Sequence, residues 1–232
     1  MPPLFLTREH INPLKTYIIF MFGYRPLMPE KFLVENHEIE IEELDGLLRY
    51  SRGDTSKLIK KSSYSLRIIP SPAVGYGVHY LTINFKEPVV VPPKDTFKGY
   101  VESPCNIELK LGEMELDSIK LGKEKYTIHG TVDIGDISRY HLSEVYTKEP
   151  DSLCVTKFIL SNGSAYWKTF EKLVFPIWET IMYYSEDKAY YPTILNLTKN
   201  GTVELINTAK APKNGLIGTK NITPVSSFLR RI

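Results

Sequence analysis

Along much of the chain, apolar and polar residues alternate in short stretches. Residues 37–42 read His-Glu-Ile-Glu-Ile-Glu, which places Ile39 and Ile41 on one face of an extended segment and three carboxylates on the other. Such a pattern is typical of a strand with one buried face. Further stretches predict strands at 65–69, 78–85, 89–91, 97–101, 106–111, 113–121, 126–129, 140–146, 154–160, 166–174, 193–197 and 202–206.

Two turns predict hairpins between neighbouring stretches. Asn200-Gly201 separates two alternating segments, and both residues tolerate the positive φ that a two-residue type I′ turn or a bulged turn requires. Gly112-Glu113 separates two further segments, and glycine adopts turn conformations that other residues resist. We therefore expect a hairpin at each of these positions.

The prolines between residues 70 and 104 argue against a continuous helix there, because proline lacks the N–H that a helix or a sheet ladder needs. They are Pro70, Pro72, Pro88, Pro92, Pro93 and Pro104. Many short strands and few helices predict a mainly β fold, with an antiparallel, sandwich-like architecture and little helix. The number of strands fits either one large sandwich or two stacked β units.

The composition of the 232 residues, 42% hydrophobic and 24% charged, is that of a globular protein. The formal net charge is +2, and no basic stripe indicates nucleic-acid binding. The apolar run at 17–22 is too short to cross a bilayer, and no cleavage site follows it, so we expect neither membrane insertion nor a signal peptide. The chain is therefore expected in the cytoplasm. A regulatory contact with a membrane protein cannot be tested from the sequence.

Motifs for cofactors, metals and catalysis are missing from the sequence. Gly75-Tyr76-Gly77 begins like a dinucleotide fingerprint, but Tyr80 stands where the third glycine is required. Cys105 and Cys154 have no CxxC spacing, so we expect two small buried side chains rather than a disulfide or a zinc site. We predict no cofactor and no metal. An enzyme has no positive evidence, although catalytic groups can converge from distant positions.

The stretch from residue 125 to residue 147 is the densest in chemically active side chains. If 139–147 is a strand, Arg139 and His141 share one face and Glu144 lies on the other, so neither face is purely apolar. One hypothesis is an edge strand whose polar residues deter pairing with other chains. The other is a pocket where an arginine binds an anion and a glutamate holds that arginine. The candidate ligand-binding residues are His129, Arg139, His141, Glu144 and Tyr146.

Aromatic side chains make up 12% of the chain and are densest between Trp167 and Tyr191. Such rings stack against sugars or bases in some proteins, but they also fill sandwich cores and subunit interfaces. The near-neutral charge favours a core or an interface. The candidate interface residues are Trp167, Trp178, Tyr183 and Tyr184.

Two segments of the chain resemble a known family. Residues 125–130, Lys-Tyr-Thr-Ile-His-Gly, and residues 139–147, Arg-Tyr-His-Leu-Ser-Glu-Val-Tyr-Thr, are similar to the central signature of an archaeal family catalogued as a domain of unknown function. Residues 22–24 and 87–93 are also similar to that family's pattern. The resemblance implies an archaeal, cytoplasmic origin and carries no known activity.

The resemblance begins at about residue 21 and also bears on domain organisation. It implies that residues 1–20 are an N-terminal extension, or the product of an upstream start codon with the native start at Met21. No linker rich in Gly or Ser and no shift in composition divides the rest. We therefore expect a single continuous β-rich domain over residues 21–232, with 112–122 as the place where a subdivision would fall.

These patterns predict a non-catalytic binding or assembly protein that acts through sheet faces or edges. Its partner would be another protein or a second copy of the chain. The alternative is an enzyme, or a binder of a small molecule or carbohydrate, with a pocket around Arg139, His141 and Glu144. A concave site where these groups converge favours the alternative, and a flat apolar face in a symmetric contact favours assembly.

Overall fold

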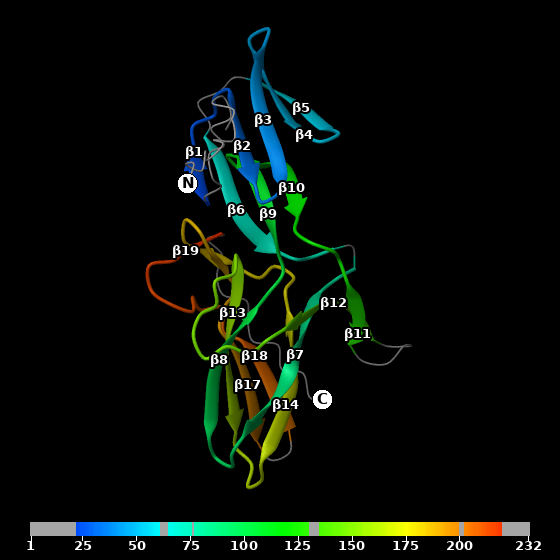
Figure 1. The fold of residues 1–232 in the computed structure, drawn as a ribbon, viewed down its shortest axis with the longest axis vertical. Helices are drawn as coiled ribbons and strands as arrows, with labels where there is room; N and C mark the ends of the chain where they lie inside the picture. The colour runs from blue at the N-terminus through cyan, green and yellow to red at the C-terminus, as the bar shows by residue number, and fades with distance from the viewer. Residues whose placement is uncertain (1–21, 61–64, 76, 130–134, 200–201, 220–232) are drawn as a thin grey trace, which may run out of the picture. The chain divides into compact units, whose positions relative to one another are not determined.

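The structure is a computed structural model that describes residues 22–60, 65–75, 77–129, 135–199 and 202–219 (Figure 1). The described residues form strands and turns and contain no helix. They form two compact units, a smaller one over 26–60 and a larger one over 22–25 and 65–219. The single continuous domain predicted over 21–232 stays a prediction, as does the extension over 1–20, which lies outside the described residues.

The smaller unit is one antiparallel sheet in which each strand pairs with the next along the chain. Its strands are β2 (Glu30–Val34), β3 (His37–Leu44), β4 (Leu47–Arg52) and β5 (Thr55–Lys60). Ile39 and Ile41 are buried and Glu38 is exposed, so the alternation at the start of β3 is confirmed. Asp45 and Gly46 both have positive φ, 50° and 78°, as a type I′ turn between β3 and β4 requires.

The first sheet of the larger unit has the strand order β1-β6-β9-β10 and is antiparallel. Its strands are β1 (Gly23–Arg25), β6 (Leu66–Pro72), β9 (Cys105–Leu111) and β10 (Met114–Lys120). The predicted hairpin at Gly112 is confirmed, because β9 and β10 pair up to the turn and Gly112 has a φ of 57°. Pro70 and Pro72 lie beyond the residues that pair with β1, where a missing N–H is tolerated at the edge of a sheet.

The second sheet has the order β11-β12-β7-β14. Its strands are β7 (Tyr80–Val91), β11 (Tyr126–His129), β12 (Asp136–Ser143) and β14 (Lys168–Pro176). β12 runs parallel to β7, whereas β11 pairs antiparallel with β12 and β14 pairs antiparallel with β7. The β7–β14 ladder shifts register at Glu171, opposite a part of β7 that contains Pro88.

The third sheet has the order β18-β17-β13-β16-β15-β19, and β8 also pairs with β13. Its strands are β8 (Thr96–Glu102), β13 (Cys154–Asn162), β15 (Tyr183–Tyr184), β16 (Ala189–Tyr190), β17 (Ile194–Lys199), β18 (Thr202–Asn207) and β19 (Ile217–Gly218). Lys199 pairs with Thr202, so the predicted hairpin around Asn200-Gly201 is confirmed as a pair of strands. The two turn residues themselves lie outside the described residues.

The second and third sheets of the larger unit pack against each other through aromatic rings. Phe85 on β7 stacks on Phe158 of β13, with ring centroids 5.5 Å apart, and Phe97 of β8 lies 6.0 Å from the same ring. Phe175 on β14 meets the edge of Tyr191, 5.6 Å away. This packing of sheets confirms the predicted mainly β, sandwich-like fold, to which the structure adds parallel pairs of strands.

The strand predicted over 139–147 has different bounds in the structure. β12 spans Asp136–Ser143, and Tyr146 forms an isolated bridge with Tyr100 instead. The parallel ladder with β7 ends where β7 approaches Pro88, a residue that cannot donate to a ladder. Glu144 and Tyr146 therefore lie past the end of the strand, and the face expected for Glu144 if 139–147 were a strand does not exist.

The aromatic contact between the sheets gives a stability prediction. Phe158 is fully buried between Phe85 and Phe97, so Phe158→Ala leaves a cavity, and we expect a loss of about 3–5 kcal/mol in the free energy of unfolding. Urea denaturation measures this loss. Tyr166→Ala removes a ring of similar size from an exposed position and should change the free energy by no more than about 0.5 kcal/mol. Equal effects of the two substitutions would contradict the packing described.

Candidate functional site

Arg139 and His141 lie on the face of β12 that is turned toward the core. β12 pairs with β7 so that Arg139 lies beside Leu81 and His141 lies beside Ile83. Leu81 and Ile83 are fully buried, and residues side by side in a sheet share a face. The strand therefore brings two ionisable side chains to the interior side of the sheet.

Arg139 is only 3% exposed and is held by the segment that precedes β11. Its Nη1 lies 3.3 Å from Glu124 Oε1, and its Nη2 donates a hydrogen bond of 3.4 Å to the carbonyl oxygen of Lys123. The guanidinium carbon lies 5.5 Å from the centre of the Tyr126 ring, within the range of a cation–π contact. The acid that holds Arg139 is thus Glu124, and not Glu144 as the pocket hypothesis expects.

Glu124 compensates the charge of Arg139. Burial alone would raise the pKa of Glu124, but the hydrogen bond and charge of Lys120, together with the charge of Arg139, outweigh burial and lower that pKa. Glu124 is therefore ionised at neutral pH, and Arg139 lies between a carboxylate and an aromatic ring. This arrangement fixes the chain just before β11 onto β12.

His141 is neutral at neutral pH. Burial lowers its pKa below the usual value, and the charges of Arg139 and Lys125 lower it further, against the opposing effect of Glu102. Within the described part of the chain, Nε2 of His141 and Nε of Arg139 have no hydrogen-bond partner. The two side chains thus carry unused hydrogen-bonding capacity in a buried place, which is costly unless a further group meets it.

Glu144 and Tyr146 have partners other than Arg139. Glu144 forms an ion pair of 2.8 Å with Lys86, and both side chains are exposed, so the pair contributes little stability. The Tyr146 hydroxyl lies 3.5 Å from a carboxylate oxygen of Glu102. The structure therefore does not place Glu144 beside Arg139.

His129, the remaining candidate ligand-binding residue, lies at the end of β11. It pairs with Asp136, whereas Arg139 pairs with Tyr126 at the opposite end of the same ladder. The side chain of His129 lies outside the described part of the structure. Of the five candidates, the structure brings Arg139 and His141 to one face, and the ligand-binding role of all five stays a prediction.

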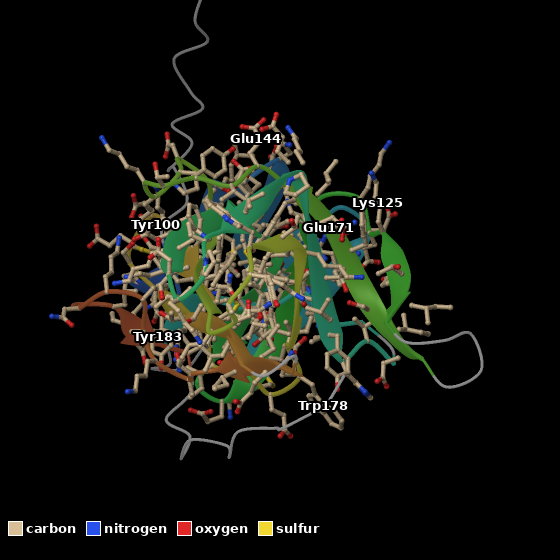
Figure 2. The ribbon with its side chains drawn as sticks, turned by 90° about the horizontal axis from the view of Figure 1, so that it is seen from below. Tyr100, Lys125, Glu144, Glu171, Trp178 and Tyr183 are labelled. Carbon is tan, nitrogen blue, oxygen red and sulfur yellow. The ribbon has the colours of Figure 1, made fainter. Side chains whose placement is uncertain are left out.

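The four candidate interface residues do not form one surface. Trp167 and Trp178 are exposed, Tyr183 is half-buried, and Tyr184 is buried with its ring 5.8 Å from that of Phe22. Figure 2 shows Trp178 and Tyr183 well apart at the periphery of the view. Tyr184 has no exposed surface to offer a partner, because it fills the core.

A surface that sequence reasoning missed lies along β11. Tyr126 and Ile128 on β11 share a face with Ile137 on β12, because Tyr126 pairs with Arg139 and Ile128 pairs with Ile137. Tyr126, Ile128 and Ile137 are 48%, 49% and 48% exposed. We call these three residues the β11 surface. The alternation of Tyr126, Thr127 and Ile128 is the sequence signal that could have identified it.

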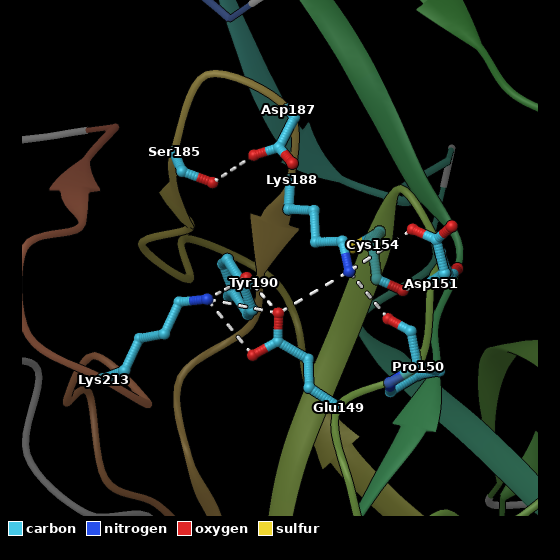
Figure 3. A network of polar contacts seen from close by, with 10 residues as sticks. Glu149, Pro150, Asp151, Cys154, Ser185, Asp187, Lys188, Tyr190 and Lys213 are labelled. Carbon is cyan, nitrogen blue, oxygen red and sulfur yellow. Dashed lines mark hydrogen bonds and ion pairs between the residues drawn. The ribbon is translucent and has the colours of Figure 1, made fainter.

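A polar network around Glu149 joins three separate segments of the larger unit (Figure 3). The Tyr190 hydroxyl donates a hydrogen bond of 2.6 Å to Glu149, and Lys213 Nζ lies 3.2 Å from both of its carboxylate oxygens. Lys188 Nζ lies 3.7 Å from Glu149 and donates to the carbonyl oxygen of Pro150 at 2.9 Å. The charges and donors of this network are matched, which indicates a structural role rather than a binding site.

The chemistry of Cys105 and Cys154 is that of small buried side chains. Both are free and buried, as expected from the sequence. Burial, with the nearby Cys105, raises the pKa of the Cys154 thiol well above its usual value, so the reactive thiolate is disfavoured. Among the described residues, no group of three or more His, Cys, Asp or Glu side chains could hold a metal ion.

The fold and these sites define an all-β protein of several packed sheets, with an open apolar strand edge and a buried arginine beneath it. The model of the family described as "Protein of unknown function (DUF432)" matches residues 21–231, so the chain belongs to that family. This match confirms the predicted family resemblance, while the archaeal origin stays a prediction. No curated protein and no solved structure matches the chain significantly. The described residues contain no helix that could span a bilayer.

The Glu149 network predicts a stability that depends on pH. Burial alone would raise the pKa of Glu149, but hydrogen bonds from Tyr190 and Lys213 outweigh it, so the folded-state pKa lies below 4.5. The carboxylate therefore stabilises the fold above pH 4.5, and this contribution is lost as pH falls through the lowered pKa. We expect Glu149→Gln to cost about 1–2 kcal/mol at pH 7 in urea denaturation.

The difference between Glu149→Gln and the unsubstituted protein should shrink as the pH falls below 4.5. Glu171→Gln, at an exposed position on β14, is the matched control and should have little effect at either pH. A Glu149→Gln effect that is the same at pH 7 and at low pH would show that the carboxylate charge does not stabilise the network.

Proposed function

We propose that the protein is a non-catalytic binding module that assembles with a second copy of itself through the β11 surface. The observation that carries this proposal is an exposed strand edge beside an exposed apolar face. The proposal needs no cofactor, nucleic acid or membrane insertion. We place the assembly in the cytoplasm, on the sequence evidence that residues 17–22 resemble neither a membrane span nor a signal peptide.

The outer edge of β11 is open to a further strand. In the described part of the chain, β11 pairs with β12 alone, so backbone N–H and C=O groups on its other side are free to form a ladder. Monomeric proteins blunt such edges with proline, inward charges or bulges. β11 instead carries the apolar side chains of Tyr126 and Ile128 on one face, which favours strand addition.

The sequence of β11 is complementary to itself. If two copies pair antiparallel about Thr127, Tyr126 of one copy lies opposite Ile128 of the second, and the two threonines face each other. Aromatic side chains opposite β-branched ones, and threonines opposite threonines, are favourable cross-strand pairs. Because a two-fold contact uses the same surface on both copies, every favourable pair that lies off the axis occurs twice. The self-complementarity of β11 therefore favours a second copy of the chain as the partner.

A second candidate is a binder of a small anionic molecule around Arg139 and His141. The observation that favours it is the buried nitrogen atoms of Arg139 and His141 that have no hydrogen-bond partner among the described residues. A guanidinium with free N–H groups fits a carboxylate or a phosphate. Sodium phosphate or citrate that raises the melting temperature of the protein but not of Arg139→Gln would support this function, and an unchanged melting temperature would argue against it.

Assembly through β11 is tested by Ile128→Lys. We expect the unsubstituted protein to be a dimer, and the lysine to raise its dissociation constant by about a hundredfold, because a charge enters the contact on both copies. Native mass spectrometry and light scattering over a dilution series measure this change. Ile128→Pro should have the same effect, because it removes an N–H that the alternation of the ladder turns toward the outer edge of β11.

Ile217→Lys is the matched control for Ile128→Lys. Ile217 is also an exposed isoleucine on a short strand, β19, and its substitution should leave the dimer unchanged. A chain that stays monomeric at about 100 μM would contradict assembly with a second copy. Equal weakening by both lysines would contradict the assignment to β11.

A further inference from the structure

One end of the larger unit carries exposed aromatic rings between two turns. The β7–β8 and β13–β14 turns lie at this end (Figure 1), and the backbone amide of Asn162 donates to the carbonyl oxygen of Asp95 at 2.9 Å to join them. Tyr166 and Trp167 are 80% and 67% exposed, and Val90 beside them is also exposed. We call Val90, Tyr166 and Trp167 the aromatic tip.

A buried amide fixes the loop that carries these rings. The side chain of Asn162 is fully buried, and its Nδ2 lies 3.0 Å from the carbonyl oxygens of Val91 and Pro92 and 2.7 Å from that of Tyr166. Its Oδ1 accepts a hydrogen bond of 2.7 Å from the Ser164 hydroxyl. The end of β13 is thereby tied to the β7–β8 turn and to the residue just before Trp167.

Two further contacts hold the same loop from other sides. The backbone amide of Gly163 donates to the carbonyl oxygen of Thr198 near the end of β17, at 2.6 Å. Lys94 Nζ donates to the carbonyl oxygen of Gly163. The exposed rings therefore project from a fixed loop, so a partner that binds them meets little cost in ordering the chain.

The pairing of β14 with β7 places the apolar side chains on the outer face. Val90 pairs with Thr169, whereas Phe170 and Val91, at the alternate positions, are buried in the core. Trp167 directly precedes β14 and is exposed, so its ring also lies outside the core. The aromatic tip is thus an apolar patch outside the core of the unit.

Lysines lie close to the aromatic tip. Lys94 stands in the β7–β8 turn and Lys168 follows Trp167, while Lys98 lies on β8, opposite Ile159. Asp95, next to Lys94, accepts a hydrogen bond of 2.7 Å from the amide of Thr96. Within the described part of the chain, neither Lys98 nor Lys168 forms an ion pair. Exposed Trp and Tyr flanked by lysines are the side chains that favour the boundary between lipid headgroups and acyl chains.

From this combination we infer that the aromatic tip docks on the surface of an anionic lipid bilayer. Trp167 and Tyr166 enter the headgroup region, and Lys98 and Lys168 meet the lipid phosphates. A sugar would need free polar groups beside the rings, but the side-chain amide of Asn162 and the hydroxyl of Ser164 are already bonded to the loop. The contact is peripheral and does not depend on assembly through β11.

Tryptophan fluorescence with vesicles tests this inference. The chain has two tryptophans, so in Trp178→Phe the signal reports Trp167 alone. We expect a blue shift with vesicles that contain phosphatidylglycerol, weaker binding at high salt, and little binding to pure phosphatidylcholine. Absence of a shift with the anionic vesicles would overturn the inference, and so would equal binding to both kinds of vesicle.

Co-sedimentation with the same vesicles tests the assignment to the tip. Trp167→Ala should raise the dissociation constant by about tenfold or more, and Lys98→Glu with Lys168→Glu should have a similar effect. Trp178→Ala is the matched control, because it removes an exposed tryptophan just past the other end of β14. An equal loss of vesicle binding with Trp178→Ala would overturn the assignment, as would vesicle binding that Trp167→Ala leaves unchanged.

Ile128→Lys should bind the vesicles normally. This variant separates a failure of the membrane inference from a failure of the assembly proposal.

Discussion

Burying a polar side chain inside the protein is costly unless it finds a partner, and the contacts that hold the exposed surfaces of the larger unit follow from that constraint. An unpaired polar group in the interior costs more than a hydrogen bond gains, so the backbone nearby is brought to it. Asn162 shows this most fully, since its side-chain amide contacts three carbonyl oxygens from two turns. Thr82 and Ser138, buried on the opposite face of β7 and β12, likewise meet each other at 2.7 Å.

Each of the two surfaces proposed for function lies over one of these buried polar residues. Asn162 fixes the loop that carries Tyr166 and Trp167, so an exposed aromatic pair has a defined position. Arg139 lies under Tyr126 and is paired with Glu124, so the chain that leads into β11 is held onto β12. The interior polar contacts thus supply the rigidity that an exposed binding surface needs.

The sequence predicts those strands and turns whose conformation depends on residues close together in the chain. The strand at His37 follows from period-two alternation, and the hairpins at Gly112 and Asn200-Gly201 follow from the conformations that turns require. These are local properties, and the structure contains the strands that they predict. The mainly β class follows from the same local patterns summed along the chain.

Local sequence patterns do not indicate which distant strands pair. The predictions that depend on such pairing, the bounds of β12 and the partner of Arg139, are therefore wrong. The parallel β12–β7 pair joins residues more than fifty positions apart, and it decides that β12 ends at Ser143. The partner of Arg139 is Glu124 rather than Glu144, because β11 folds back onto β12. The Asn162 contacts likewise join residues about seventy positions apart. A single sequence contains no signal for such contacts.

If the outer edge of β11 pairs with a second copy of the chain, hydrogen exchange at that edge depends on the protein concentration. Lys125 and Tyr140 share a backbone hydrogen bond, so the alternation of an antiparallel ladder turns the amides of Tyr126 and Ile128 toward the outer edge. Pairing predicts that these two amides exchange more slowly as the protein concentration rises over a dilution series, while amides of β14, already paired within the chain, do not change. Exchange at Tyr126 and Ile128 that is independent of concentration would contradict pairing through β11.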